Sequence, residues 1–124
     1  MHSNQTAAYR GVQKSAMSDR HAEAAVLMKA AALLKQCQAN WDAEGRKALM
    51  EKALRYNQLL WSFFQSALAD PKNPLPESLK EDIFRLSLFI DRQIFEIIAY
   101  PAPEKMDIII QINTNIAEGL RAAA

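Results

Sequence analysis

Residues 43–69 read AEGRKALMEKALRYNQLLWSFFQSALA, and Asp70 and Pro71 follow directly. Apolar side chains recur in this stretch every three or four residues and cover about half of a helical circumference. Proline cannot continue a helix, because it lacks the backbone N–H and its ring clashes with the preceding turn. The stretch therefore predicts a long amphipathic helix from about Ala43 to Ala69, with Asp42 as its N-cap.

The segment before this helix divides into two parts. Residues 18–39 also show a helical apolar period, and we predict a first helix that begins with Ser18 as its N-cap. Its side chains are mostly small, so that a neighbouring helix can pack closely, and Cys37 on its stripe is expected to be a buried hydrophobe. Residues 1–17 lack such a period, and we predict a flexible N-terminal arm there.

Prolines divide the rest of the chain into two more helices. Pro71, Pro74 and Pro76 precede a third helix, at about residues 77–99, and Pro101 and Pro103 precede a fourth, at about residues 104–120. Gly119 is the expected C-cap of the fourth helix. No strand pattern is present, so the predicted fold class is all-α. We expect an antiparallel bundle of about four helices as a single domain over residues 18–124, after an arm at 1–17.

The third helix is unusual because it is apolar on two faces. One stripe contains leucines and isoleucines between Leu79 and Ile97, whereas Phe84, Leu88 and Phe95 form a second stripe, roughly 120 degrees away. A single core requires only one stripe. The second stripe is therefore predicted to contact another helix of this chain, a second copy in a homodimer, or a partner.

Two asparagines interrupt apolar stripes, Asn57 in the second helix and Asn113 in the fourth. A buried amide without hydrogen-bond partners costs roughly 1–3 kcal/mol, so each must find partners. The two can bond to each other, or to each other's backbone, and fix the register of the bundle. Alternatively, they line a groove and bond the backbone of a bound partner. We favour the first hypothesis.

Charge excludes an indiscriminate nucleic-acid binder, because the net charge is only +1. The charges are unevenly distributed: residues 1–69 contain nine Lys/Arg and five Asp/Glu, and residues 70–124 contain six and nine. This division indicates either oppositely charged helices lying side by side or a weakly basic face that meets an acidic partner.

Sequence signatures of an enzyme are absent: no phosphate-binding glycine loop, nucleophile elbow or metal-spaced His and Cys cluster occurs. We therefore expect a non-enzymatic protein without a cofactor or a metal. Cys37 is the only cysteine, and the N-terminal residues lack the apolar stretch of a secretory signal. No segment approaches the roughly 20 apolar residues that a membrane-spanning helix needs, so we expect a cytoplasmic protein.

Several short motifs, in their order and spacing, resemble those of the flagellar FlaF family. The central ones are YNQLLW at residues 56–61 and ADPKNPLP at residues 69–76, and QINTNIAEGL at residues 111–120 resembles the closing motif of the family. Residues 83–90, 8–10 and 20–23 are also similar to family segments. One departure is Phe89, where the family is expected to favour Trp, but an aromatic side chain is kept.

The resemblance implies a positive factor for flagellin synthesis and export, which acts as a flagellin-binding chaperone opposite the repressor FlbT. We expect a helical segment of flagellin, more specifically the C-terminal one, to dock in an apolar groove of the bundle. The expected contact residues are Phe84, Leu88 and Phe95, followed by Trp61 and Leu59.

Two alternatives remain at this stage. One is control of flagellin mRNA translation, either through direct RNA contacts of Lys47, Lys52 and Arg55 or as an adaptor that binds FlbT. The other is that the two-faced third helix is the central helix of its own bundle, so that Phe84, Leu88 and Phe95 are core residues.

Overall fold

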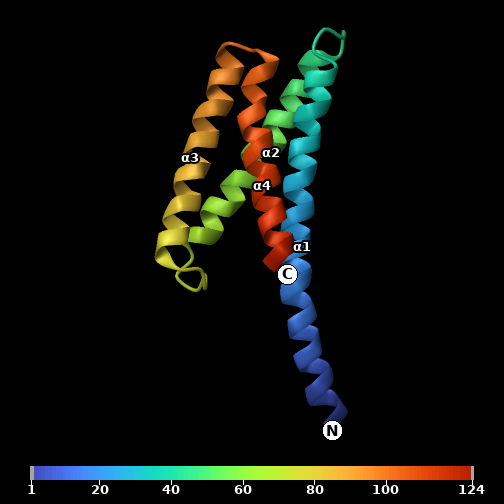
Figure 1. The fold of residues 1–124 in the computed structure, drawn as a ribbon, viewed down its shortest axis with the longest axis vertical. Helices are drawn as coiled ribbons and strands as arrows, with labels where there is room; N and C mark the ends of the chain where they lie inside the picture. Colours follow the sequence, from blue (N-terminus) through green and yellow to red (C-terminus); the bar gives the residue numbers. More distant parts are fainter. Residues whose placement is uncertain (1, 124) are drawn as a thin grey trace.

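The computed structural model describes the backbone of residues 2–123 and the side chains of residues 20–122. The elements are α1 (His2–Ala39), α2 (Arg46–Ala69), α3 (Glu77–Ala99), a 3-10 turn η1 (Pro103–Met106) and α4 (Asp107–Ala123). Successive helices run in opposite directions (Figure 1), and the described residues contain no strand. The predicted all-α antiparallel bundle of four helices is confirmed.

The helices meet around one apolar core. Alanines of α1 at positions 24, 30 and 31 are buried, as is Ala117 of α4, and such small side chains let α1 and α4 lie close together. The α2 helix crosses this pair obliquely (Figure 1) and fills the core with Trp61 and Leu60. The core therefore has a closely packed pair of helices on one side and a large aromatic side chain on the other.

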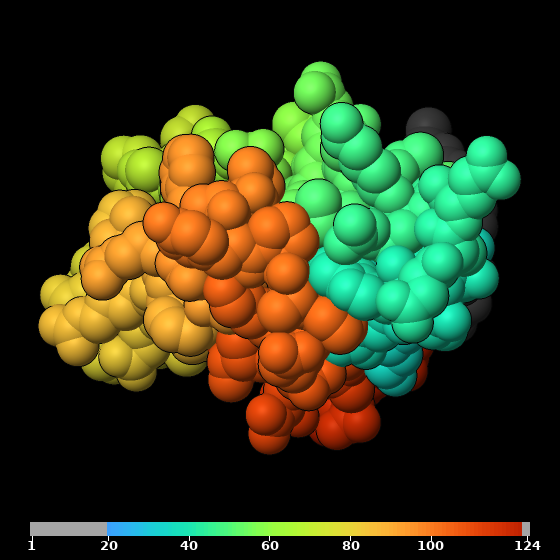
Figure 2. All heavy atoms as spheres, turned by 90° about the horizontal axis from the view of Figure 1, so that it is seen from above, coloured from blue at the N-terminus to red at the C-terminus, as the bar shows by residue number. Residues whose placement is uncertain are grey.

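The α3 helix lies at the edge of the molecule. It packs on α2 and, near its carboxyl end, on η1, through buried Ile90, Ile94 and Ile97. Seen along the bundle, α3 forms one side of the molecule and the α1–α2 connection forms the other (Figure 2). Gln65 of α2 ties α3 in place, because its Nε2 donates to Ser87 Oγ at 3.0 Å and to Asp91 Oδ2 at 3.1 Å.

The starts of the first two helices differ from the predictions. α1 begins at His2 rather than at Ser18, and its N-terminal part extends as an arm beyond the other helices (Figure 1). The structure does not describe the side chains of residues 1–19. The predicted flexible arm at residues 1–17 falls within this range, so its flexibility stays a prediction. α2 begins at Arg46, with Gly45 and not Asp42 before it, because residues 40–45 form turns closed by the Arg46 guanidinium over the Trp41 ring, at 4.4 Å.

The last helix differs at both ends. The predicted start at Glu104 is a 3-10 turn, and the α-helical bonding begins at Asp107. Gln38 of α1 holds this start, since its Nε2 donates to Pro103 O at 2.9 Å and to Asp107 Oδ1 at 2.7 Å. Gly119 is not a C-cap: it lies inside α4, and its φ is not positive.

Candidate functional site

A chain of three buried polar side chains links α1, α2 and α4. Asn57 Nδ2 donates to Ala30 O at 3.2 Å and to Ala53 O at 2.8 Å, and Asn57 Oδ1 accepts from Asn113 Nδ2 at 2.7 Å. Asn113 Oδ1 in turn accepts from Trp61 Nε1 at 2.9 Å. Both asparagines and Trp61 are fully buried. The two amides thus meet each other, as the register hypothesis requires, and neither is exposed in a surface groove.

This network also corrects one candidate contact. Trp61 was expected among the partner-binding residues, but its side chain is fully buried and its indole N–H is bonded to Asn113. The indole ring packs edge-on against Phe64, with ring centroids 5.5 Å apart. A tryptophan on an amphipathic helix is compatible with either role from the sequence, and the oblique course of α2 places this one inside.

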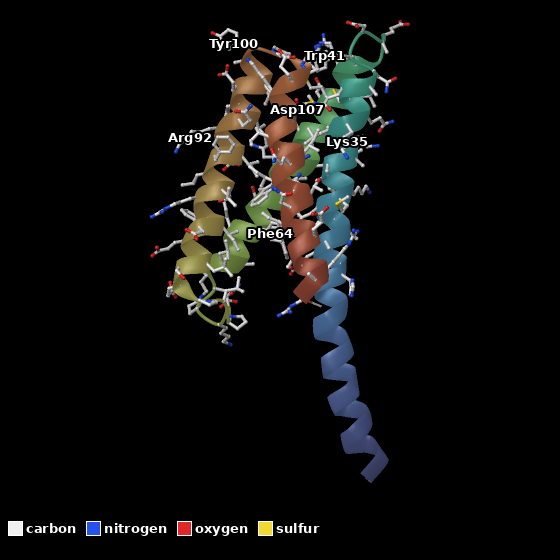
Figure 3. All side chains as sticks on the ribbon, viewed as in Figure 1. Lys35, Trp41, Phe64, Arg92, Tyr100 and Asp107 are labelled. Carbon is white, nitrogen blue, oxygen red and sulfur yellow. The ribbon has the colours of Figure 1, made fainter. Side chains whose placement is uncertain are left out.

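The second stripe of α3 faces away from the core. Phe84, Leu88 and Phe95 are 45, 39 and 67% exposed, whereas Ile90 on the opposite side of the helix is 0% exposed. Ile98 extends this stripe by one turn and is also exposed. α3 is therefore not a central helix, and its outer stripe, defined here by Phe84, Leu88 and Phe95, is surface. Polar neighbours border it, among them Arg92, which points away from the bundle (Figure 3).

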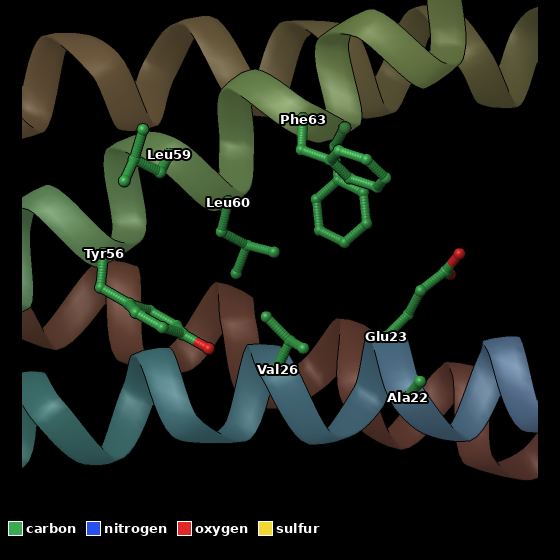
Figure 4. Close-up of a pocket in the computed structure, with 8 residues that line it drawn as sticks. Ala22, Glu23, Val26, Tyr56, Leu59, Leu60 and Phe63 are labelled. Carbon is green, nitrogen blue, oxygen red and sulfur yellow. The ribbon is translucent and has the colours of Figure 1, made fainter.

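A second apolar surface lies between α1 and α2, and we call it the α1–α2 groove. Its volume is about 610 Å³. It is lined from α1 by Ala22, Glu23 and Val26 and from α2 by Tyr56, Leu59, Leu60, Phe63 and Phe64. In Figure 4, Val26 and Leu60 point into the space between the two helices, and Phe63 lies on the α2 side of it. The surface is concave and bounded by two helices, which is the shape that receives a third helix.

Leu59 was expected as a contact residue, and it lies in this groove with 60% of its side chain exposed. Phe63 is one of the apolar residues whose spacing predicted this helix and was not expected as a contact residue, yet it is 65% exposed. The spacing of the two residues, one helical turn apart, was a usable signal, because side chains at i and i+4 share a face. Phe63 was missed because a helix that crosses its neighbours obliquely buries a narrower arc than its apolar residues cover.

The charges around the groove differ between its two ends. The Nζ atom of Lys29 lies 5.3 Å from the centre of the Tyr56 ring, so a cation stands at the Tyr56 end. Lys52 is exposed on α2, one turn before Tyr56 and two turns before Leu59. Glu23 and Ala22 lie at the other end of the groove (Figure 4). The groove therefore has a basic end and an end with a carboxylate.

Among the described residues, no group of three or more His, Cys, Asp and Glu side chains is placed to hold a metal ion. Lys47, Lys52 and Arg55, the residues of the RNA hypothesis, are exposed. Burial raises the pKa of the Cys37 thiol from its ordinary value, and the positive charge of Arg46 acts in the opposite direction. None of the described helices is long and apolar enough to cross a membrane.

Comparison with known protein families gives one result. The family described as flagellar protein FlaF matches the chain over residues 5–120. This range contains all four helices almost completely, the buried network and both apolar surfaces. No curated protein and no solved structure matches the chain.

Proposed function

Because the chain belongs to the FlaF family of flagellar proteins and so takes part in flagellar biosynthesis, we propose that it acts as a flagellin-binding chaperone. In this proposal a helical segment of flagellin, its C-terminal one, docks in the α1–α2 groove. The segment is thereby kept from assembling before export. Binding is stoichiometric and needs no nucleotide or metal ion.

The observation that carries this proposal is the unpartnered apolar lining of the α1–α2 groove. Leu59 and Phe63, at 60 and 65% exposure, stand beside partly buried Tyr56 and Val26, so that water covers apolar surface on both walls. Burial of apolar surface contributes about 25 cal/mol per Å², and fully burying one leucine or phenylalanine side chain stabilises by roughly 1.5–3 kcal/mol. An amphipathic helix laid between α1 and α2 removes this surface from water.

The outer stripe of α3 is the competing contact surface, and it was the first choice from the sequence. Leu88 and Phe95 stand on α3 alone, so a partner would touch them on one side only, and Phe84 borders a smaller pocket between α2 and α3 that charged side chains also line. A groove between two helices contacts a bound helix on two sides and buries more of its apolar face. This difference in shape favours the α1–α2 groove.

The test is co-purification with full-length flagellin and with flagellin that lacks its C-terminal helix, at low and high salt. We expect a one-to-one complex that withstands salt and is lost with the truncation. The variant Leu59→Ser/Phe63→Ser removes two exposed side chains from the groove and is expected to abolish the complex. The matched control Phe84→Ser/Phe95→Ser removes two exposed side chains from α3 and is expected to keep it.

Each remaining outcome has a definite meaning. Loss of the complex in the α3 variant alone would transfer the site to the outer stripe. A complex unaffected by either variant would contradict an apolar docking mechanism. Steep loss of binding with added salt, together with binding of the flagellin mRNA leader, would favour translational control through Lys47, Lys52 and Arg55.

A further inference from the structure

The two rims of the α1–α2 groove carry cations at the same end. Lys29 of α1 is one turn beyond Val26, and its Nζ atom lies 5.3 Å from the centre of the Tyr56 ring. Lys52 of α2 shares a face with Tyr56 and Leu59, because these residues are four and seven positions apart. Both lysines are exposed, and neither forms a salt bridge within the described residues.

The opposite end of the groove has a different character. Glu23 lines it from α1, and Phe63 lines it from α2 (Figure 4). Positive charge along the groove is therefore concentrated beside Lys29 and Lys52, whereas Glu23 at the other end has the cation Arg20 one turn before it on α1. A helix carries roughly half a positive charge at its amino end and half a negative charge at its carboxyl end, so its carboxyl end is the one attracted to the two lysines.

From this asymmetry we infer that the groove orients its occupant: an amphipathic helix binds with its carboxyl end, and acidic side chains near that end, against Lys29 and Lys52. Its amino end lies beside Glu23 and Phe63. The inference rests on the proposed function and adds the direction of the bound helix and the charge pattern that is selected. The occupant then runs parallel to α1 and antiparallel to α2, because Lys29 follows Ala22 along α1.

The length of the groove sets the length of the recognised segment. From Ala22 to Lys29 the rim of α1 spans eight residues, and the seven steps between them cover about 10 Å along the helix axis. An occupant helix of about three turns covers this distance with one flanking turn. Its apolar positions are expected at spacings of three and four residues, and its acidic positions in the last turn.

The direction is tested with a synthetic peptide of the C-terminal helical segment of flagellin that carries a nitroxide spin label at one end. With the label at the carboxyl end, we expect the backbone amide signals of Lys29 and Lys52 to broaden in the nuclear magnetic resonance spectrum. With the label at the amino end, those of Ala22 and Phe63 broaden instead. The reverse pattern, or equal broadening with both labels, would overturn the inference while leaving groove binding intact.

The charge pattern is tested separately by reversing the two lysines. Lys29→Glu/Lys52→Glu is expected to weaken peptide binding about tenfold at low salt, since each charge acts on the helix end and on its acidic side chains. The control Lys35→Glu/Lys47→Glu makes the same change in net charge on the same two helices, with exposed lysines that lie more than two turns from the nearest lining residue. It is expected to bind as the unaltered protein does.

Three results separate this inference from the proposed function. Equal affinities of the two lysine variants would overturn the charge pattern but not the chaperone proposal. If Lys29→Glu/Lys52→Glu loses its helical circular dichroism, Lys29→Gln/Lys52→Gln takes its place. About a threefold loss of peptide affinity is expected for that variant, and an unchanged affinity would count against the inference. Failure of the unaltered protein to bind either terminal segment of flagellin would overturn both.

Discussion

Replacing Asn113 by Leu is expected to destabilise the bundle more than replacing Asn57, although both amides are fully buried and bonded to each other. Asn113→Leu leaves two buried groups without a partner, the N–H of Trp61 and the Oδ1 atom of Asn57. Each unsatisfied group costs roughly 1–3 kcal/mol, so the expected loss is about 2–6 kcal/mol.

Asn57→Leu leaves only one buried group unsatisfied, the Nδ2 atom of Asn113. The backbone carbonyls of Ala30 and Ala53, which accept from Asn57, keep the helical hydrogen bonds of their own turns. The expected loss of unfolding free energy is therefore about 1–3 kcal/mol. The different shape of leucine adds packing strain in both variants, and this strain is expected to be similar at the two sites.

The double variant tests the reasoning most sharply. It leaves only the Trp61 N–H unpaired, one group instead of the three that the single variants leave together. Its loss of unfolding free energy is expected to be smaller than the sum of the single losses by roughly 2–6 kcal/mol. Urea denaturation followed by circular dichroism measures all three values. Additivity within about 0.5 kcal/mol, or a larger loss for Asn57→Leu, would refute the account.

Three further predictions concern separate features of the fold. Gly119→Ala is expected to stabilise the protein by about 1 kcal/mol in thermal or urea unfolding, because Gly119 lies inside α4 and a Cβ would meet no atom within 4 Å; an unchanged or lower stability would contradict this. Gln65→Ala is expected to cost about 1–2 kcal/mol, because two hydrogen bonds from α2 to α3 are lost, and increased hydrogen exchange in α3 but not in α4 would locate the effect. Burial raises the pKa of the Cys37 thiol, so as the pH rises this thiol ionises first in the unfolded chain. The contribution of Cys37 to the free energy of unfolding is therefore fully present below its ordinary pKa of 9.0 and is lost as the pH rises above that value. Urea unfolding at pH 8 and pH 10 should therefore show a smaller decrease in stability for Cys37→Ala than for the unaltered protein, and equal decreases would contradict the prediction.

Local sequence signals were sufficient for the helices themselves. The prolines at 71, 76 and 103 mark where helices end or begin, because the ring forbids the helical hydrogen bond, and the structure has breaks at these places. The periodicity predicted the amphipathic helix α2, and the amides at positions 57 and 113 were recognised as lying within apolar stripes and in need of partners. These features depend on residues within a few turns of one another.

Signals at helix starts were less reliable. Asp42 and Ser18 were expected as caps, but the backbone around Asp42 is held in turns by the Trp41–Arg46 contact, and α1 continues through Ser18 to His2. A capping residue contributes only about 1 kcal/mol, so neighbouring contacts of similar strength decide whether it is used. Gly119 shows the same limit: a glycine is compatible with a C-cap, but here the helix continues past it to Ala123, with Leu120 packed against the core.

The sequence by itself determined that this protein is a helical bundle of the FlaF family, with apolar surface beyond what one core needs. The tertiary structure decided which of these apolar side chains remain exposed to solvent. Trp61 is buried, whereas Phe63 is exposed beside Leu59 in a groove with lysines at one end. The physical reason is that helical periodicity depends on the chain's local geometry alone. The crossing angle between helices, which selects the buried part of each apolar arc, is set by all the side chains that meet in the core.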